Sequence, residues 1–271
     1  MIFCCPVCGK SLERRVKSLF CPDGHCFDIS RYGYVNLLMS NQSSDKRHGD
    51  DRLMVEARRD FLDAGYYVPI RDALLELALP CLKNGSRILD AGCGEAWYTS
   101  ALYQAAEDKG ICVSVACSDI SKDALRYAAK RLPEAELAVC SSAHLPVADS
   151  GCDMLLNFFS PLEPVEFHRV LSPGGYLIRA VVLPKHLWGL KAAVYDEPYE
   201  NGEPETKLDG FELCSRVDVK TRIKVVGEDV KRLFSMTPYY YKTSAADQAK
   251  LNALESVETE LEVCLLRYQR V

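Results

Sequence analysis

Cysteine residues gather at the start of this chain. Of its 13 cysteines, five fall within the first 26 residues, where Cys5 and Cys8 form a Cys-x2-Cys pair. After a short interval, Cys21 and His25 form a Cys-x3-His pair. Turns of this kind bring soft sulfur and imidazole ligands toward one point, where they can surround zinc tetrahedrally. The spacing therefore predicts a zinc site made by these four side chains.

This zinc site is expected to be structural. A segment of about 36 residues cannot bury enough apolar surface to fold unaided, so metal binding would supply the folding energy. Four protein ligands also leave no coordination position for a substrate. Cys4 neighbours Cys5, and Cys26 neighbours His25, so either could replace its neighbour as a ligand. Unrelated free thiols are the alternative to a metal site.

A glycine-rich turn is the second motif with chemical meaning. An apolar run at 87–91 leads into Gly92 and Gly94, and a helical pattern follows. Glycine lets the backbone approach a ligand closely at the carboxyl end of a strand, where open α/β sheets bind ligands. The third glycine of a dinucleotide fingerprint is absent, so the acid-x-Gly-x-Gly pattern favours S-adenosylmethionine. Asp90 would hold the ammonium group of its methionine part, and Asp119 the ribose hydroxyls. An ordinary tight turn is the alternative.

The elements that must position these residues alternate between strand and helix from residue 86 onward. The predicted strands are 87–91, 112–117, 135–140, 154–158 and 176–182, and the predicted helices are 96–107, 122–132, 165–171 and 185–195. This alternation implies parallel strands joined by crossover helices, and hence an open α/β sheet. Two later strand patterns, at 211–226 and 258–269, would add an antiparallel pair at one edge, with helices at 228–234 and 245–254.

The chain before this alternation is less regular. Residues 16–20 have a strand pattern between the two ligand pairs. Residues 40–51 are polar throughout and predict a flexible connector. Apolar residues at helical spacing then predict helices at 53–62 and from Pro69 onward, since proline suits the first helical turn.

Composition and charge narrow the class of protein. The chain has 271 residues, 48% of them hydrophobic and 26% charged, which is typical of one or two folded domains. No apolar run approaches the ~18 residues of a membrane span, and no signal peptide is recognisable, so a cytoplasmic protein is expected. The net charge is −5, yet residues 1–59 hold 10 Lys and Arg against 7 Asp and Glu. This asymmetry favours a polyanion bound mainly at the front of the chain.

These motifs together resemble a known family, the bacterial 23S rRNA (guanine-N(1)-)-methyltransferases with an N-terminal zinc-binding module. The resemblance runs from the four predicted zinc ligands through residues 57–67 to the turn at 90–95 and covers most of the chain. It implies a class I S-adenosylmethionine-dependent methyltransferase fold, Rossmann-like with a mostly parallel seven-stranded sheet, and a small zinc-ribbon-like domain. It implies S-adenosylmethionine and structural Zn²⁺ as cofactors. The implied reaction is methylation of ring nitrogen 1 of a guanine in a 23S rRNA hairpin loop, and the implied assembly is a homodimer.

The resemblance also implies cofactor contacts that spacing alone does not suggest, at Tyr67, Tyr98, Thr99 and His186. Without the family, Tyr67 would be taken for a core aromatic residue and His186 for a surface residue at a helix start. Residues 157–161 read Asn-Phe-Phe-Ser-Pro where the family more often has Arg-Ile-Tyr-Ala-Pro, in the loop nearest the target base.

On this basis the chain divides into a zinc-binding RNA-recognition module at 1–36, a linker and helical connector at 37–80, and a methyltransferase domain at 81–271. The candidate phosphate contacts are Arg14, Arg15, Lys17, Arg58 and Arg59. Two other functions remain open. One is a small-molecule methyltransferase, which the zinc module makes less favoured. The other is a zinc-ribbon RNA-binding protein without activity, which the intact glycine turn makes less favoured. No residue is assigned as the acceptor of the guanine proton.

Overall fold

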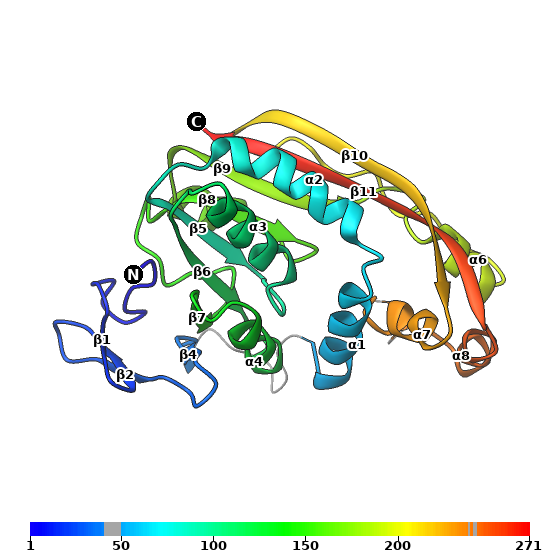
Figure 1. The fold of residues 1–271 in the computed structure, drawn as a ribbon, viewed down its shortest axis with the longest axis horizontal. Helices are drawn as coiled ribbons and strands as arrows, with labels where there is room; N and C mark the ends of the chain where they lie inside the picture. The colour runs from blue at the N-terminus through cyan, green and yellow to red at the C-terminus, as the bar shows by residue number, and fades with distance from the viewer. Residues whose placement is uncertain (41–49, 238, 241–242) are drawn as a thin grey trace.

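The computed structural model describes residues 1–40, 50–237, 239–240 and 243–271 (Figure 1). Its strands are β1 (Glu13–Arg15), β2 (Ser18–Phe20), β3 (Cys26–Asp28), β4 (Val35–Asn36), β5 (Ser86–Ala91), β6 (Val113–Asp119), β7 (Glu136–Val139), β8 (Cys152–Phe158), β9 (Leu171–Val182), β10 (Phe211–Val226) and β11 (Ser256–Arg270). Its helices are α1 (Arg52–Asp63), α2 (Val68–Ala78), the 3-10 helix η2 (Leu79–Cys81), α3 (Trp97–Asp108), α4 (Lys122–Arg131), α5 (Pro164–Val170), α6 (Trp188–Val194), α7 (Glu228–Ser235) and α8 (Ala245–Asn252).

These strands form two sheets. The smaller has the order β1-β2-β3, and the larger has the order β10-β11-β9-β8-β5-β6-β7-β4. In the larger sheet the strands from β9 to β4 run parallel, and β10 and β11 add an antiparallel pair at one edge. The predicted open α/β sheet and its antiparallel edge are therefore confirmed, with element ends displaced by a few residues. The resemblance implies seven strands, and the sheet has eight because β4 is added at its other edge.

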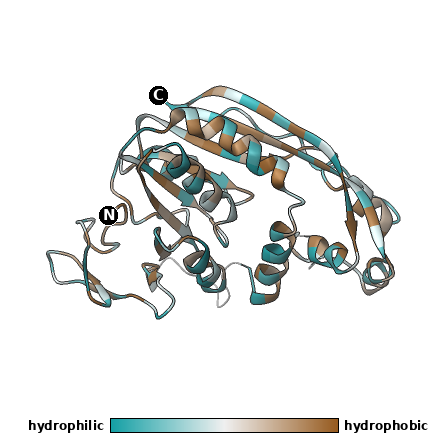
Figure 2. Ribbon diagram, viewed as in Figure 1, coloured by the Kyte–Doolittle hydropathy of each residue, from teal (hydrophilic) through white to brown (hydrophobic). Residues whose placement is uncertain are grey.

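Each face of the large sheet has its own core, because neighbouring residues of a strand point to opposite faces. On one face, Ile88 lies among buried residues of the helices α2, α3, α4, α6 and α7. On the other, Leu89 lies with Phe167 of α5 and with Phe3 and Leu19 of the N-terminal region. Hydrophobic residues accordingly run through the central strands (Figure 2). A mostly parallel sheet needs cover on both faces, and the N-terminal region supplies part of it here.

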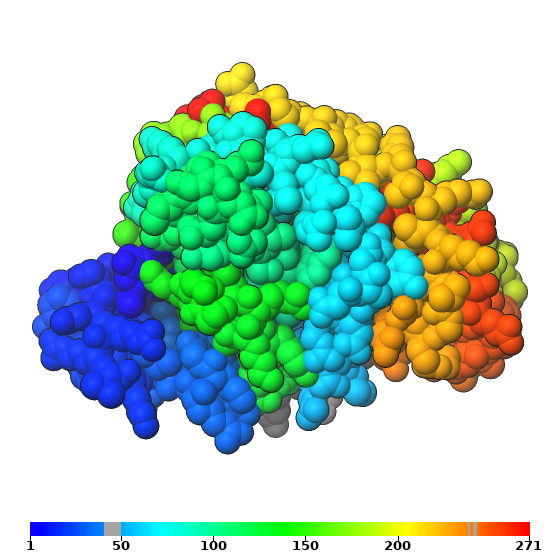
Figure 3. All heavy atoms as spheres, in the orientation of Figure 1, coloured from blue at the N-terminus to red at the C-terminus, as the bar shows by residue number. Residues whose placement is uncertain are grey.

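The N-terminal region is fastened to the large sheet at several points. The backbone N–H of Ile2 donates to the Glu136 carboxylate at 2.8 Å, and that of Cys4 donates to the Pro146 carbonyl at 2.7 Å. Strand β4 pairs with β7 through Val35 and Ala138. This region therefore stands as a lobe at one end of the molecule, in contact with the sheet (Figure 3).

The strand expected at 16–20 is corrected by the structure to a hairpin. Strands β1 and β2 pair in antiparallel fashion, and Val16 and Lys17 form the turn between them. Val16 has a φ of 52° and is 89% exposed. A β-branched residue rarely adopts a left-handed backbone, so valine indicated a strand where the chain in fact turns.

Helix α1 begins where the predicted connector ends. Most of the connector expected at 40–51 lies outside the described residues. The Asp51 side chain accepts a hydrogen bond from the Met54 N–H at 3.0 Å and caps the helix. Within the described part of the chain, every helix is too short or too polar to cross a membrane.

Candidate functional site

Two tight turns carry the four predicted metal ligands. The N–H of Gly9 donates to the Cys5 carbonyl at 2.8 Å, and the N–H of Gly24 donates to the Cys21 carbonyl at 3.0 Å. Both glycines have a positive φ, 71° and 85°, which other residues adopt only at a cost. Each turn thus holds two ligands on one side of the chain, as the spacing predicted.

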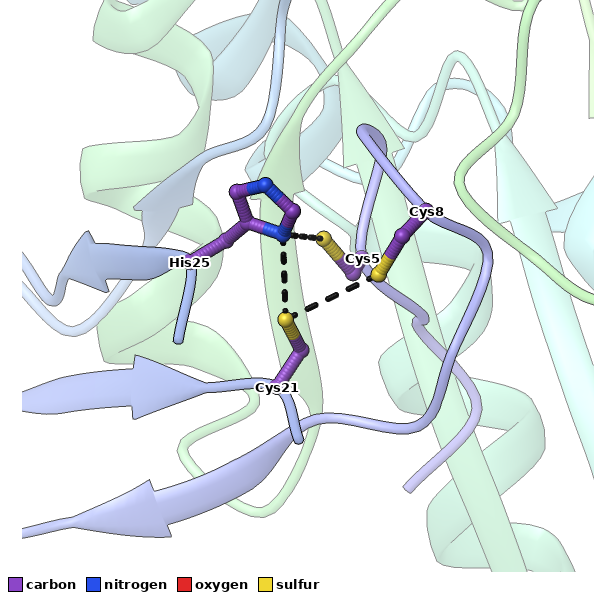
Figure 4. A group of neighbouring side chains, drawn as sticks. All are labelled: Cys5, Cys8, Cys21 and His25. Carbon is purple, nitrogen blue, oxygen red and sulfur yellow. Dashed lines mark hydrogen bonds between the residues drawn. The ribbon is translucent and has the colours of Figure 1, made fainter. Parts of the chain in front are cut away.

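The ligand atoms of the two turns meet at one point (Figure 4). The Cys8 and Cys21 sulfurs are 3.6 Å apart, and His25 Nδ1 lies 3.2 Å from Cys21 Sγ and 3.6 Å from Cys5 Sγ. All four atoms lie within 4.8 Å of one another. Sulfurs at the corners of a tetrahedron around zinc would be about 3.8 Å apart, given Zn–S bonds of about 2.3 Å. The arrangement therefore suits a closed, four-ligand zinc site.

The two neighbouring cysteines lie outside this group. Cys26 is exposed on β3, and Cys4 is buried where its backbone meets Pro146. Of the two alternatives that the sequence left open, neither Cys4 nor Cys26 joins the cluster that the described residues form.

The glycine-rich turn lies at the carboxyl end of β5. The backbone N–H groups of Gly92 and Cys93 both donate to the Ser118 carbonyl at 2.9 Å, which fastens the turn to β6. Gly92 has a φ of 88°, and a Cβ added there would lie 2.5 Å from the Cβ of Ser160. Ser160 is fixed in turn, since its hydroxyl donates to the Ala91 carbonyl at 2.8 Å. Only glycine fits this position.

A cavity of about 1040 Å³ opens over this turn. Seven of the eight predicted cofactor residues line it: Tyr67, Asp90, Gly92, Gly94, Tyr98, Asp119 and His186. Its wall continues past Phe159 to the ends of β8 and β9 and to the segment around Asn201. Ligand cavities of proteins span about 300–1,000 Å³, so this one has room for a cofactor and a second group.

Asp90 is buried beneath the turn. The Thr99 hydroxyl donates to Asp90 Oδ2, whereas Oδ1 is enclosed without a hydrogen-bond partner among the described residues. Burial, together with the nearby Asp119 and Glu95 carboxylates, raises the pKa of Asp90 to about 7, although the hydrogen bond from Thr99 lowers it. Thr99 does not line the cavity, and its link to the site is the hydrogen bond that it donates to Asp90.

Asp119 ends β6 and faces the same cavity. Its Oδ2 accepts from the Gly94 N–H and its Oδ1 from the Ser121 N–H, both at 2.8 Å. Each oxygen keeps a second lone pair, and the two backbone donors fix the direction of the carboxylate. Asp119 is therefore held ready to accept two further hydrogen bonds from the cavity side.

Tyr67 and His186 come together from distant parts of the chain. The Tyr67 hydroxyl lies 3.5 Å from His186 Nε2, and both side chains are buried. His186 Nδ1 accepts from the Glu262 N–H at 3.3 Å, so the proton of the neutral ring is on Nε2. Burial lowers the pKa of His186 to about 3. His186 is thus neutral with its lone pair engaged, and it cannot serve as a general base.

Aromatic rings form one wall of the cavity. Tyr98 lies 4.8 Å from Phe158 and 6.4 Å from Phe159, and Tyr67 lies 6.4 Å from Phe159, measured between ring centroids. Phe159 has a φ of 54° and is 45% exposed. The two phenylalanines were not predicted as site residues, and only their place in the loop nearest the target base pointed to them.

Comparison with known proteins identifies both parts of the chain. Residues 3–46 match the family model described as RlmA, N-terminal, a zinc ribbon, and residues 88–175 match a methyltransferase domain. A Micromonospora griseorubida protein named among the 23S rRNA (guanine-N(1)-)-methyltransferases is 33% identical over 98% of this chain and 97% of its own. The chain belongs to this family. A Bacillus subtilis relative of similar name is 30% identical, over 98% of this chain and 96% of its own. The 23S rRNA (guanine(748)-N(1))-methyltransferase of Streptomyces fradiae is 31% identical, over 86% of this chain and 84% of its own.

The cofactors of this methyltransferase are S-adenosylmethionine and a structural zinc ion, as expected. The cavity suits S-adenosylmethionine: Asp90 Oδ1 is a buried acceptor without a partner, which an ammonium group would satisfy. The bare backbone at Gly92 and Gly94 leaves space along the turn. Which residues contact the cofactor remains a prediction from the sequence, which this placement supports.

Cofactor binding is expected to depend on pH through Asp90. In the protein without cofactor, Asp90 has a pKa of about 7. An ammonium partner favours the ionised carboxylate, so cofactor binding below that pH should release a proton. Affinity for S-adenosylhomocysteine should therefore fall about tenfold between about pH 8 and about pH 6. Calorimetry at both pH values measures this change. Asp90→Asn should bind more weakly with no such dependence, and equal wild-type affinity at both pH values would contradict the assignment.

Asp119→Ala is expected to weaken binding of S-adenosylhomocysteine. Two ribose hydroxyls would lose their acceptor, which should cost about 2–3 kcal/mol, or roughly 30- to 150-fold in affinity. Asp123→Ala is the matched control, because Asp123 lies on α4 and pairs with Arg126 outside the cavity. Calorimetry of the two variants tests the assignment, and equal affinities would show that Asp119 does not hold the ribose.

Proposed function

We propose that this methyltransferase transfers the methyl group of S-adenosylmethionine to ring nitrogen 1 of a guanine in a 23S rRNA hairpin loop. The observation that carries the proposal is the similarity to the S. fradiae enzyme over most of both chains, in a chain that has a zinc ribbon followed by a methyltransferase domain. That relative acts, by its name, on nitrogen 1 of guanine 748 in 23S rRNA.

A hairpin loop is the favoured target for a chemical reason. Nitrogen 1 of guanine is hidden by base pairing within a helix, and unpaired bases can be splayed out and bound. The cavity continues beyond the cofactor residues toward Phe159, which offers an aromatic surface for such a base. The cofactor supplies a methyl group already activated by its sulfonium charge, so the main task of the protein is to orient the base.

Guanine must lose the proton of nitrogen 1 when the methyl group is added there. His186 is excluded as its acceptor, because its lone pair accepts from the Glu262 N–H. Besides the predicted cofactor residues, the described carboxylates that line the cavity are Asp50, Glu95, Glu163 and Glu205. Water or one of these carboxylates would take the proton.

The candidate phosphate contacts fall into two groups in the structure. Arg14, Arg15 and Lys17 are exposed on the hairpin of the zinc ribbon. Arg58 and Arg59 form ion pairs with Asp50 and Asp60. The exposed hairpin therefore offers the better surface for the RNA backbone, since Arg14, Arg15 and Lys17 are exposed and the ion pair of Arg15 with Glu13 lies fully at the surface.

We also infer the organisation in which this activity would operate. Residues 1–36 would recognise RNA, 37–80 would connect the parts, and 81–271 would bind the cofactor and the target base. The family resemblance supports a homodimer in the cytoplasm. Sedimentation of the purified protein would measure the oligomeric state.

Primer extension on 23S rRNA tests the proposed reaction. A methyl group on nitrogen 1 blocks Watson–Crick pairing, so reverse transcriptase should stop one nucleotide before the target. The stop should require both protein and S-adenosylmethionine, and nucleoside mass spectrometry should find 1-methylguanosine. If neither a stop nor a new methylguanine is found, the proposal fails and a small-molecule methyltransferase becomes the better reading.

A further inference from the structure

Arg179 is a buried cation that faces the cavity without an ion-pair partner among the described residues. It lies on β9, is 9% exposed and lines the cavity wall. Its Nε and Nη1 atoms are enclosed and have no hydrogen-bond partner among the described residues. It also takes part in none of the ion pairs that these residues form. The proposed reaction as described assigns it no role.

Such an arrangement is costly in a folded chain, because a buried charge is normally paired or hydrogen-bonded. Burial lowers the pKa of Arg179. The titratable groups that face it are Tyr268 of β11, whose hydroxyl interacts with the guanidinium as a hydrogen-bond partner, and the exposed Glu205. The Tyr268 hydroxyl donates to the Thr206 carbonyl at 2.9 Å, and no ion pair joins Arg179 to Glu205. Neither neighbour satisfies the Nε and Nη1 donors, which are therefore left for a group that enters the cavity.

Arg267 shows that this is not the ordinary state of a half-buried arginine here. Its Nε also lacks a partner, but Nη1 donates to the Leu77 carbonyl and Nη2 to the Ser215 hydroxyl, both at 3.1 Å. Arg267 lies outside the cavity wall. Arg58 also lines the cavity, but it pairs with Asp50. Among the described residues, Arg179 is thus the arginine in which a terminal Nη atom, and not Nε alone, is enclosed without a partner.

The position of Arg179 places it on the side of the cavity where the target base is expected, beside the loop at 157–161. Strand β9 pairs in parallel with β8, and Arg179 is the register partner of Asn157. The Asn157 amide donates to the Ser160 hydroxyl at 2.6 Å and to the Pro161 carbonyl at 3.1 Å, so it holds the loop that follows β8. Two strands, β8 and β5, separate β9 from the strand that ends at Asp119. Arg179 therefore lies beside the loop at 157–161, which is expected nearest the target base, and away from the predicted ribose site.

We propose that Arg179 binds the O6 and N7 edge of the target guanine. The proposal rests on the proposed function. A guanidinium presents two parallel donors that match these two acceptors, and arginine on this edge is the commonest specific contact to guanine. A phosphodiester would remain at the surface, whereas Arg179 is buried. Negative charge also moves onto O6 as nitrogen 1 loses its proton, and a fixed cation there would stabilise it.

The test compares two RNA hairpins that differ only at the target nucleotide, mapped beforehand by primer extension. One carries guanine, and the other carries 2-aminopurine, which lacks O6. In the presence of S-adenosylhomocysteine, the wild-type protein should bind the guanine hairpin about 5- to 150-fold more tightly. Arg179→Met should bind both hairpins about equally. The difference between the two preferences isolates the contact of Arg179 with O6.

Two controls separate a lost contact from a damaged fold. Arg179→Met should keep its affinity for S-adenosylhomocysteine within about twofold, since Arg179 is not a predicted cofactor residue and two strands separate β9 from the strand that ends at Asp119. Arg222→Met removes an arginine that is 73% exposed and paired with Glu260 on the outer strands, and it should keep the wild-type preference for guanine.

Two results would overturn the inference. If Arg179→Met lowers the affinity for both hairpins by the same factor, Arg179 contacts phosphate and not the base. If it keeps the wild-type preference for guanine while binding the cofactor, Arg179 does not contact the base at all. Either result can occur with a wild-type protein that methylates rRNA, so the proposed function would survive. If the wild-type protein gives no enzyme-dependent stop in primer extension, the proposed function itself fails, and that result is distinct from the two above.

Discussion

Cys8→Ser is expected to release the zinc ion and unfold the zinc ribbon. Structural zinc in small domains contributes on the order of 10–16 kcal/mol, and serine offers a hard oxygen in place of a thiolate. The three strands of the small sheet have three residues each and cannot replace that energy by burial. Elemental analysis should find about one zinc per wild-type chain and far less in the variant.

Cys26→Ser is the matched control for this prediction. Cys26 is exposed and lies outside the four-ligand group, so this variant should keep its zinc. Zinc at full occupancy in Cys8→Ser, or its loss from Cys26→Ser, would show that the ligand set is wrong.

Zinc loss is also expected to lower the melting temperature of the whole chain. Phe3 and Leu19 of the N-terminal region belong to the core on the second face of the large sheet. If the ribbon unfolds, that apolar face loses part of its cover. Circular dichroism during heating would measure the change.

Gly92→Ala is expected to destabilise the protein and to prevent cofactor binding. The added Cβ would lie 2.5 Å from the Ser160 Cβ, and alanine would have to adopt a φ of 88°. The left-handed backbone costs about 1–2 kcal/mol and overpacking about 1–3 kcal/mol, so the free energy of unfolding should fall by about 2–5 kcal/mol. Thermal denaturation measures this loss, and calorimetry should detect no binding of S-adenosylhomocysteine.

Two further variants separate the clash from the backbone effect. Gly94→Ala requires a φ of 56° but places its Cβ in open space, so it should lose only the smaller, backbone part of the stability. Adding Ser160→Gly to Gly92→Ala removes the opposing Cβ and should restore part of the melting temperature. Equal destabilisation by Gly92→Ala and Gly94→Ala would show that the contact with Ser160 is not what requires glycine.

The sequence by itself determined the parts of this protein whose chemistry is local. Cys5 and Cys8 are close along the chain, as are Cys21 and His25, so a turn decides where each pair points. Strand and helix periods predicted the α/β sheet, because each period is set within a few residues. The turn at Gly92 was visible for the same reason. The resemblance to a family then supplied Tyr67 and His186, which spacing did not indicate.

The tertiary structure decided the relations between distant residues. Thr99 was predicted as a cofactor contact, and the direction of α3 turns its hydroxyl to Asp90 instead of the cavity. Strand β4 joins the large sheet through β7, which lies about 100 residues later, and no local pattern encodes that pairing. The unused donors of Arg179 depend on what β8, β11 and the segment around Glu205 place opposite it. Whether a buried charge has a partner is a property of packing, and packing brings together residues that the sequence keeps apart.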